Sequence, residues 1–200
     1  MALMKGAPSV LICLAAVVPF TRRLDAQSAQ AVSIQFSGLY NGVYGDVFTG
    51  LQNGFGGEAQ IRYTPGALSI GAGFQYTNHG VENRPEDAHL YGAFLEPRYR
   101  IHTGSNVVAP YVSARLSLLK VGFSGGDLSL TSSFIQVNGG GGLLYRLGPR
   151  LNLDMGATFG YNQLGSGTLK SKSAGSERPI ESSSGSNLVV RFGFAVGIGG

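Results

Sequence analysis

The chain has 200 residues, a formal net charge of +4 and a single cysteine, Cys13. Only 13% of its residues are charged, about half the usual share for a soluble domain. The small net charge gives no support to nucleic-acid binding, and one cysteine excludes an intrachain disulfide and a cysteine-based metal centre.

The N-terminal residues have the layout of a secretory signal peptide. A short basic segment, 1–5, precedes the apolar stretch 6–20, and small residues follow. The apolar stretch is too short for a membrane helix, which needs about 20 apolar residues. We therefore expect a signal peptide over 1–26, cleaved between positions 26 and 31, and one barrel domain over 27–200.

Eight later segments alternate apolar and polar residues with a period of two, which is the pattern of β-strands. In chain order they are 32–40, 55–63, 68–77, 90–101, 107–121, 134–146, 151–161 and 188–198. Most run to about ten residues or more, the length that a tilted strand needs to cross a bilayer. Within the sixth segment, the four glycines at 139–142 predict a bend or a bulge.

The connections between these segments alternate in length. Short turns are expected at 64–67, 102–106 and 147–150, and long loops at 41–54, 78–87, 122–131 and 163–186. The last loop, rich in Ser, Gly and Lys, is expected to be mobile. Short turns at one end and long loops at the other are typical of outer-membrane barrels. The predicted fold is all-β, an eight-stranded antiparallel up-and-down transmembrane β-barrel.

The alternation produces one apolar and one polar face, and it does not by itself say which face is inside. A soluble, secreted, lipocalin-like barrel would turn the apolar face inward around a lipophilic ligand. The apolar face is almost free of charge and is bounded by tyrosines, which favours a barrel that turns it outward to lipid. Two aromatic girdles are expected, from Tyr63, Tyr99 and Tyr145 beside the short turns and Tyr40, Tyr76, Tyr91 and Tyr161 beside the long loops.

The polar face then lines the lumen, where buried charges need partners. An eight-stranded barrel is just wide enough for side chains to fill it, so we expect a lumen plugged by ion pairs. The excess of arginines over acids leaves a narrow anion-preferring pore as an alternative. The expected lumen charges are Glu58, Arg62, Glu96, Arg98, Arg100, Arg115, Arg146, Asp154 and Arg191.

The strands YGAFLEPRYRI, APYVSARLSLL and NGGGGLLYRL resemble those of eight-stranded outer-membrane β-barrel proteins, the group of the OmpA transmembrane domain, OmpX and the opacity-type surface proteins. The resemblance covers 32–200 and rests on architecture. It implies a bacterial outer-membrane protein that is inserted by the barrel-assembly machinery and that contacts outer-membrane lipid and lipopolysaccharide. We expect a monomer. Members of the group typically end in an aromatic residue, whereas this chain ends Ile198-Gly199-Gly200.

The sequence holds no motif for catalysis, metal binding or a cofactor. Its histidines, His79, His89 and His102, lack metal-ligand spacing. Asp87 and His89 would suit a lipid A or phospholipid hydrolase only with a serine that the sequence does not place beside them. We expect no enzyme, and a structural or surface-interaction role through the long loops.

Basic residues in the last loop are candidates for contact with lipopolysaccharide phosphates, although a solvated loop is the simpler expectation. They are Lys170, Lys172 and Arg178.

Overall fold

The computed structural model describes residues 31–125, 128–165, 167–171, 177–180 and 183–199. The expected signal peptide, 1–26, lies outside these residues. The elements are β1 (Val32–Tyr44), the 3-10 turn η1 (Asp46–Phe48), β2 (Leu51–Tyr63), β3 (Leu68–Val81), β4 (Asp87–Arg100), β5 (Val108–Gly125), β6 (Leu128–Arg146), β7 (Leu151–Leu164), β8 (Gly167–Ser171), β9 (Glu177–Ile180) and β10 (Ser184–Ile198). Among the described residues, no helix combines the length and the apolarity needed to span a membrane.

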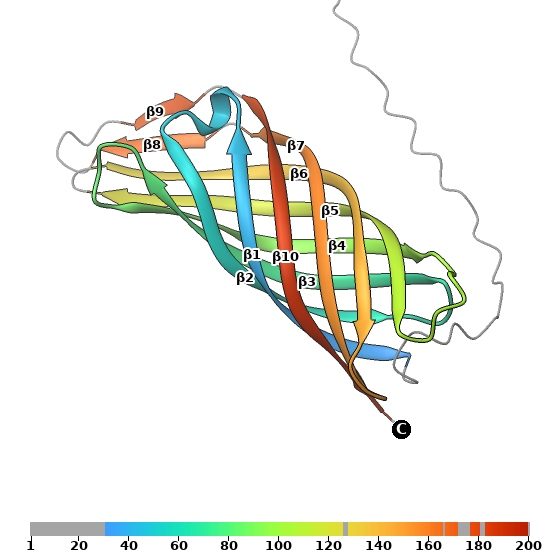
Figure 1. Cartoon of the computed structure of the whole chain (residues 1–200). Coiled ribbons are helices and arrows are strands. Elements are labelled where there is room, and N and C mark those ends of the chain that lie inside the picture. The colour runs from blue at the N-terminus through green and yellow to red at the C-terminus, as the bar shows by residue number, and fades with distance from the viewer. Residues whose placement is uncertain (1–30, 126–127, 166, 172–176, 181–182, 200) are drawn as a thin grey trace, which may run out of the picture.

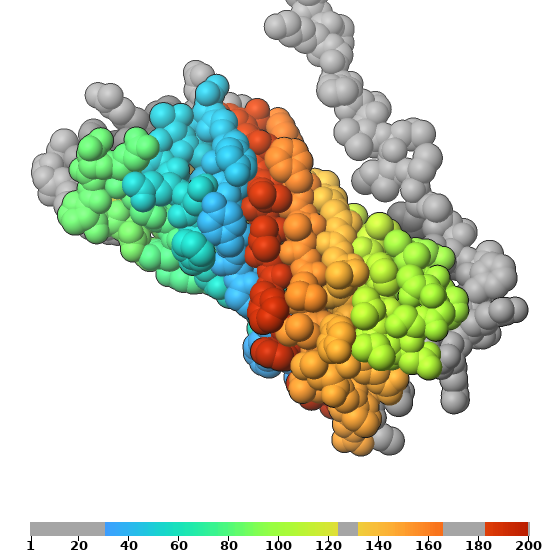
Figure 2. Space-filling view, in the orientation of Figure 1, coloured from blue at the N-terminus to red at the C-terminus, as the bar shows by residue number. Residues whose placement is uncertain are grey.

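Eight of these strands close into an antiparallel ring in the order β1-β2-β3-β4-β5-β6-β7-β10. The ring joins its first strand to its last, because β1 pairs with β10 in register from Val32↔Ile198 to Tyr44↔Ser186. Figure 2 shows this seam as the blue and red bands lying side by side. The predicted eight-stranded barrel is therefore confirmed.

The ring connections do not alternate in length as the sequence predicts, because 101–107 between β4 and β5 is longer than 82–86 between β3 and β4. The short turns lie at the end where the described chain enters and leaves the ring (Figure 1). We call this the short-turn end. The opposite end, the long-loop end, carries η1 and the hairpin β8–β9.

The apolar residues lie outside and the polar residues inside. On β5, Leu116 and Leu118 are 48% and 62% exposed, whereas Arg115 and Ser117, which alternate with them, are 2% and 0% exposed. The same alternation runs along every strand of the ring for which burial is described. The lipocalin-like alternative, with the apolar face inward, is therefore wrong.

Several strands run further toward the long-loop end than the sequence predicts. The expected loop 122–131 is wrong in this respect, because β5 continues to Gly125 and β6 begins at Leu128. These extensions pair with each other from Gly122↔Thr131 to Gly125↔Leu128. Pairing satisfies their backbone groups without an apolar pattern, which is why the periodicity did not find them.

The expected loop 163–186 also contains strands. The hairpin formed by β8 and β9 pairs with the extension of β6, from Leu128↔Ser171 to Thr131↔Thr168. It lies outside the ring, which β7 and β10 close beneath it by pairing as far as Gln163↔Ser184.

The four glycines at 139–142 form no bulge. They pair in continuous register with β5 on one side and β7 on the other. The register shift occurs instead between Leu51 and Gly54, where β2 meets β3.

Candidate functional site: a charged cluster in the lumen

Seven of the nine expected lumen charges meet inside the barrel, and we call them the charged cluster. Each is at most 5% exposed. They come from β2, β4, β5, β7 and β10. The cluster consists of Glu58, Arg62, Glu96, Arg98, Arg115, Asp154 and Arg191.

Glu96 is the centre of this cluster, because its carboxylate accepts hydrogen bonds from four guanidinium groups. Its Oε2 lies 2.6 Å from Nη1 of Arg191 and 2.7 Å from Nε of Arg115. Its Oε1 lies 3.3 Å from Nη2 of Arg62 and also accepts from Nε of Arg98. Hydrogen bonds between ionised partners are roughly twice as strong as neutral ones. One carboxylate therefore ties four strands together.

The other two carboxylates extend the cluster sideways. Asp154 accepts from Nη1 of Arg98 at 2.6 Å, and Glu58 accepts from Nη1 of Arg115 at 2.7 Å. Each of these two arginines thus bridges Glu96 to a second carboxylate. Buried carboxylates and guanidiniums stay charged only when such contacts replace the water they have lost.

The cluster reaches across the whole lumen. In the ring of eight, β4 and β10 stand opposite each other, so the pair Glu96–Arg191 spans the barrel. The pairs Arg98–Asp154 and Arg115–Glu58 each join strands three places apart in the ring. The cluster therefore contains ion pairs that cross this section of the lumen.

Glycines on the intervening strands make room for these long side chains. Arg62, Gly71 and Glu96 stand in one row across β2, β3 and β4. A Cβ added at Gly71 would lie 2.6 Å from Nη2 of Arg62, so the guanidinium reaches Glu96 by passing over the glycine. Gly156 does the same for Tyr111, whose hydroxyl lies 2.6 Å from the place of a Cβ there.

The remaining two expected lumen charges lie apart from the cluster, toward the short-turn end. Arg100 is the last residue of β4, and its Nη2 donates to the carbonyl of Gly66 in the turn between β2 and β3. Arg146 is the last residue of β6, and its Nε donates to the carbonyl of Gly148 at 3.4 Å. The expected single network is thus divided into a central cluster and two arginines beside the turns.

A layer of asparagines follows the cluster toward the long-loop end. Asn187 accepts from Nδ2 of Asn162 at 3.1 Å and of Asn138 at 3.2 Å, and donates to Asn41 at 3.4 Å. All four side chains are at most 2% exposed. This layer is neutral and hydrogen-bonded, so it extends the polar lining of the lumen without adding charge.

An apolar layer lies inside the barrel at the long-loop end. Its buried members are Val43, Phe48, Leu90, Leu119, Val121, Phe134 and Leu164. Phe48 enters from η1 and stacks on Phe134 with the ring centroids 6.0 Å apart. Next to this layer lies a cavity of about 370 Å³ lined by apolar side chains such as Phe123, with Arg84 at its wall.

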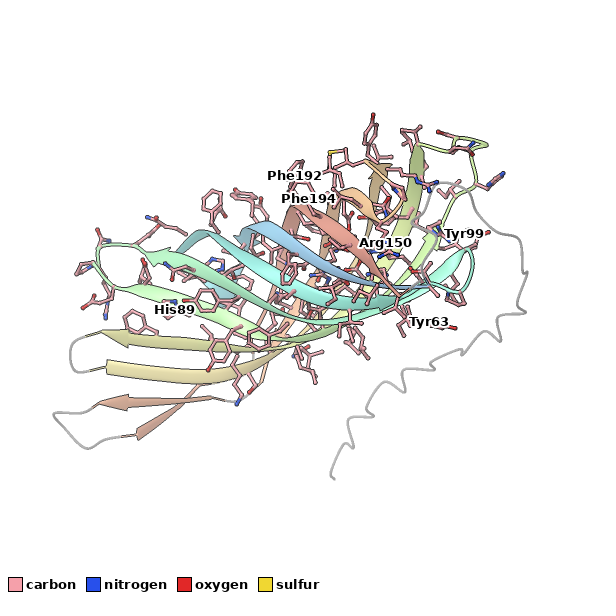
Figure 3. All side chains as sticks on the ribbon, turned by 90° about the horizontal axis from the view of Figure 1, so that it is seen from below. Tyr63, His89, Tyr99, Arg150, Phe192 and Phe194 are labelled. Carbon is pink, nitrogen blue, oxygen red and sulfur yellow. The ribbon has the colours of Figure 1, made fainter. Side chains whose placement is uncertain are left out.

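The seven expected girdle tyrosines all lie on the outer face. Five are between 41% and 55% exposed, and Tyr40 and Tyr91 are half-buried, packed against Phe55 and Phe74 respectively. Figure 3 shows Tyr63 and Tyr99 at the short-turn end and His89 near the other end. Phe192 and Phe194 project from the outer face between them.

The His89 ring has a tyrosine as its partner rather than a serine. Its Nδ1 shares a hydrogen bond of 2.7 Å with the hydroxyl of Tyr76, and the two rings stack. Asp87 accepts instead from Asn78 at 2.6 Å. Within the ranges that the structure describes, no three His, Cys, Asp or Glu side chains are grouped as a metal ion requires.

Sequence reasoning missed the neutral members of the lumen. Gln35 and Tyr111 both donate to Asp154 at 2.6 Å, and the Tyr111 ring lies 4.5 Å beneath the guanidinium of Arg98. A cation over an aromatic face is attracted by the ring electrons. A usable signal was present, since both residues share the polar face with the charges. Neither carries a charge, so only the charged residues were selected.

Comparison with solved structures supports the fold. The chain is similar to the crystal structure of Neisserial surface protein A, with a TM-score of 0.64 and 19% identity over 84% of this chain and 97% of that one. It is also similar to the outer membrane protein OprG from Pseudomonas aeruginosa, with a TM-score of 0.57 and 11% identity over 87% and 98% of the two chains.

A third similar structure is a major outer membrane protein from Thermus thermophilus, with a TM-score of 0.53 and 18% identity over 83% and 99% of the two chains. No protein-family model and no curated protein matches the chain. At these identities the likeness concerns the fold, which is that of the eight-stranded outer-membrane β-barrels.

Proposed function

We propose that the protein is an integral bacterial outer-membrane protein that acts at the cell surface and does not conduct solutes. The observation that carries the proposal is the charged cluster. Its central pair joins opposite strands of the ring, and the asparagine layer follows it along the lumen. Filled lumens suit anchors that present loops, whereas pores need a continuous water path.

The outer face supports the membrane part of the proposal. Large apolar side chains cover it and tyrosines lie near both of its ends, as expected where aromatic rings meet lipid headgroups. We infer that the short turns face the periplasm and the long loops the exterior. The His89–Tyr76 pair then lies at headgroup level, where a hydrogen-bonded ring pair needs no catalytic partner.

The proposed route and partners complete this picture. Residues 1–26 would direct secretion, and the barrel-assembly machinery would insert a monomer into the outer membrane. Lipid would contact the outer face, and lipopolysaccharide the long-loop end, with Lys170, Lys172 and Arg178 as the basic candidates. Contact between these three residues and lipopolysaccharide is a proposal.

Fractionation and planar-bilayer recording test the proposal together. The protein should require detergent for extraction, and its folded form should migrate faster than the boiled form on a gel. The wild type should give no stable channel, whereas a variant with both Arg98→Ser and Tyr111→Ser should conduct, because it empties the middle of the lumen. Recovery without detergent contradicts the membrane assignment, and a stable anion-preferring channel in the wild type supports the narrow-pore alternative instead.

The cavity at the long-loop end favours a second candidate function, the binding of a small amphiphile. Its volume of about 370 Å³ and apolar lining suit a hydrocarbon chain. Arg84, which lies over the ring of Phe123 at 5.5 Å, supplies a positive charge at its wall. We propose an apolar chain with an anionic headgroup as the occupant.

A fluorescent fatty acid, cis-parinaric acid, tests this binding with the protein in detergent-free nanodiscs. Ala88 is buried and lines the cavity, whereas Ala93 on the same strand faces outward. Ala88→Trp should abolish saturable binding because its side chain fills the cavity, and Ala93→Trp should leave binding unchanged. Equal binding by the two variants places the probe elsewhere and ends this candidate.

A further inference from the structure

A small cavity lies inside the barrel between the charged cluster and the short-turn end. Its volume is about 20 Å³, and Arg62, Arg98 and Arg100 line it together with the hydroxyl residues Thr64 and Ser69. A space of this size holds one water molecule or one monoatomic ion. The contacts of the charged cluster do not account for an occupant of this cavity.

Each of the three arginines that line the cavity has an unused hydrogen-bond donor. Nε of Arg62, Nη2 of Arg98 and Nε of Arg100 are buried and have no partner among the described residues. The three side chains are 5%, 1% and 5% exposed. A buried donor without an acceptor destabilises a protein, and a charged donor does so more than a neutral one. Three such donors around one space therefore call for an acceptor inside it.

The excess of buried positive charge also requires an acceptor in this cavity. Five arginines, those of the charged cluster and Arg100, share the interior with three carboxylates. Arg100 donates to a neutral carbonyl, that of Gly66. Arg62 shares Glu96 with three other guanidiniums. Positive charge without a counter-charge is costly to bury, and the excess is concentrated at this cavity.

We propose that this cavity is a binding site for a monoatomic anion, of the class of chloride and bromide. The anion accepts from Arg62, Arg98 and Arg100 and from the hydroxyl of Ser69. That hydroxyl is free to donate, because its oxygen already accepts from Nη1 of Arg62 at 3.0 Å. The site neutralises part of the buried charge and holds the end of β4 to β2 and β3.

Two buried acceptors oppose the anion, and they define the competing occupant. The amide of Gln35 donates to Asp154 and Ser37 and its carbonyl oxygen has no donor, and Oδ1 of Asn152, another residue of the cavity lining, has none either. A water molecule could donate to one of these oxygens and accept from one arginine. Water would leave the excess positive charge of the three guanidiniums uncompensated, and the anion is therefore the favoured occupant.

Thermal unfolding of the mature protein in detergent tests the proposal. The unfolding midpoint should rise saturably with sodium chloride or bromide when sodium gluconate keeps the ionic strength constant. Arg100→Gln should abolish the response and, without halide, should unfold no lower than wild type, because it removes an unpaired buried charge. The matched control is Arg150→Gln, an exposed arginine at the same end of the barrel (Figure 3), which should keep the full response.

Anomalous diffraction from crystals grown in sodium bromide gives a readout that needs no variant. A bromide peak within hydrogen-bond distance of Arg62, Arg98 and Arg100 supports the site. A water molecule in the cavity with no anomalous peak overturns it, and so does a midpoint that responds to chloride and gluconate alike. If Arg100→Gln does not fold, the bromide peak alone decides.

Discussion

At the scale of single residues, the lumen depends on long side chains that pass over glycines. Arg62 crosses Gly71 to reach Glu96, and Tyr111 lies over Gly156 to meet Asp154 and Arg191. A side chain at either glycine would occupy the space that its neighbour uses. The charged pairs therefore depend on the space left by Gly71 and Gly156 as well as on the charges themselves.

Gly156→Ala tests this directly. Its Cβ would lie 2.6 Å from the Tyr111 hydroxyl and 2.9 Å from Nε of Arg191. We expect the free energy of unfolding to fall by about 1–3 kcal/mol, as for other overpacked interiors. Gly139→Ala is the matched control, because a Cβ at Gly139 has no atom within 4 Å. Chemical unfolding in micelles measures both, and equal stabilities would mean that Tyr111 moves aside without loss.

Glu96→Gln removes the charge on which four guanidiniums converge and keeps the shape of the side chain. Removing one partner of a buried ion pair leaves the others unpaired and destabilises by about 3–5 kcal/mol. We expect a loss of that size, seen as a lower temperature at which the fast-migrating folded band disappears from a gel. Glu82→Gln, an exposed carboxylate at the end of β3, is the control that should show no change. An unchanged Glu96→Gln would mean that solvent already screens the cluster.

At the scale of elements, the eight strands that close the barrel are distinct from the hairpin β8–β9 beyond them. The ring closes through β7 and β10, which pair as far as Gln163↔Ser184, and the N–H of Leu164 donates to the carbonyl of Ser183 at 2.9 Å. Among the residues that the structure describes, the hairpin β8–β9 pairs with the far end of β6 and with no other strand of the ring. Its strands add to the long-loop end and are not needed to close the ring.

Replacing residues 167–182 by a short Gly-Ser turn should therefore leave the barrel folded. We expect the same faster migration of the unheated protein and an unfolding midpoint within experimental error of wild type. The β6 extension keeps its partner β5 after the replacement. Failure of the shortened chain to fold would show that the hairpin assists closure of β7 on β10.

At the scale of the whole molecule, the sequence predicted the wall better than the interior. Period-two alternation identified all eight strands and the face of each, because one face is apolar along its full length. It underestimated strand length beyond the tyrosines, where the apolar-polar alternation is lost because apolar residues such as Val43 and Leu164 face the lumen. The bulge expected at 139–142 was wrong, because Gly140 and Gly142 face inward and leave space rather than bend the chain.

The sequence predicted which residues line the interior and not how they pair with one another. The polar face indicated which charges share the lumen, yet nothing in the alternation separates Arg100 and Arg146 from the charged cluster. That separation depends on register between strands distant in sequence. The roles of Tyr111 and Gln35 depend on it too, because each meets Asp154 only after the ring has closed.

The pair Glu96–Arg191 joins strands on opposite sides of the ring, and this has a consequence for assembly. An open sheet of seven strands, lacking β10, would hold Glu96 and its arginines without Arg191 to complete them. In a bilayer such a sheet would expose the remaining charges of the cluster and two unpaired edges. Partly inserted states are therefore high in free energy, and entry into the membrane becomes a single concerted event in which the last strand arrives together with the fourth guanidinium that binds Glu96.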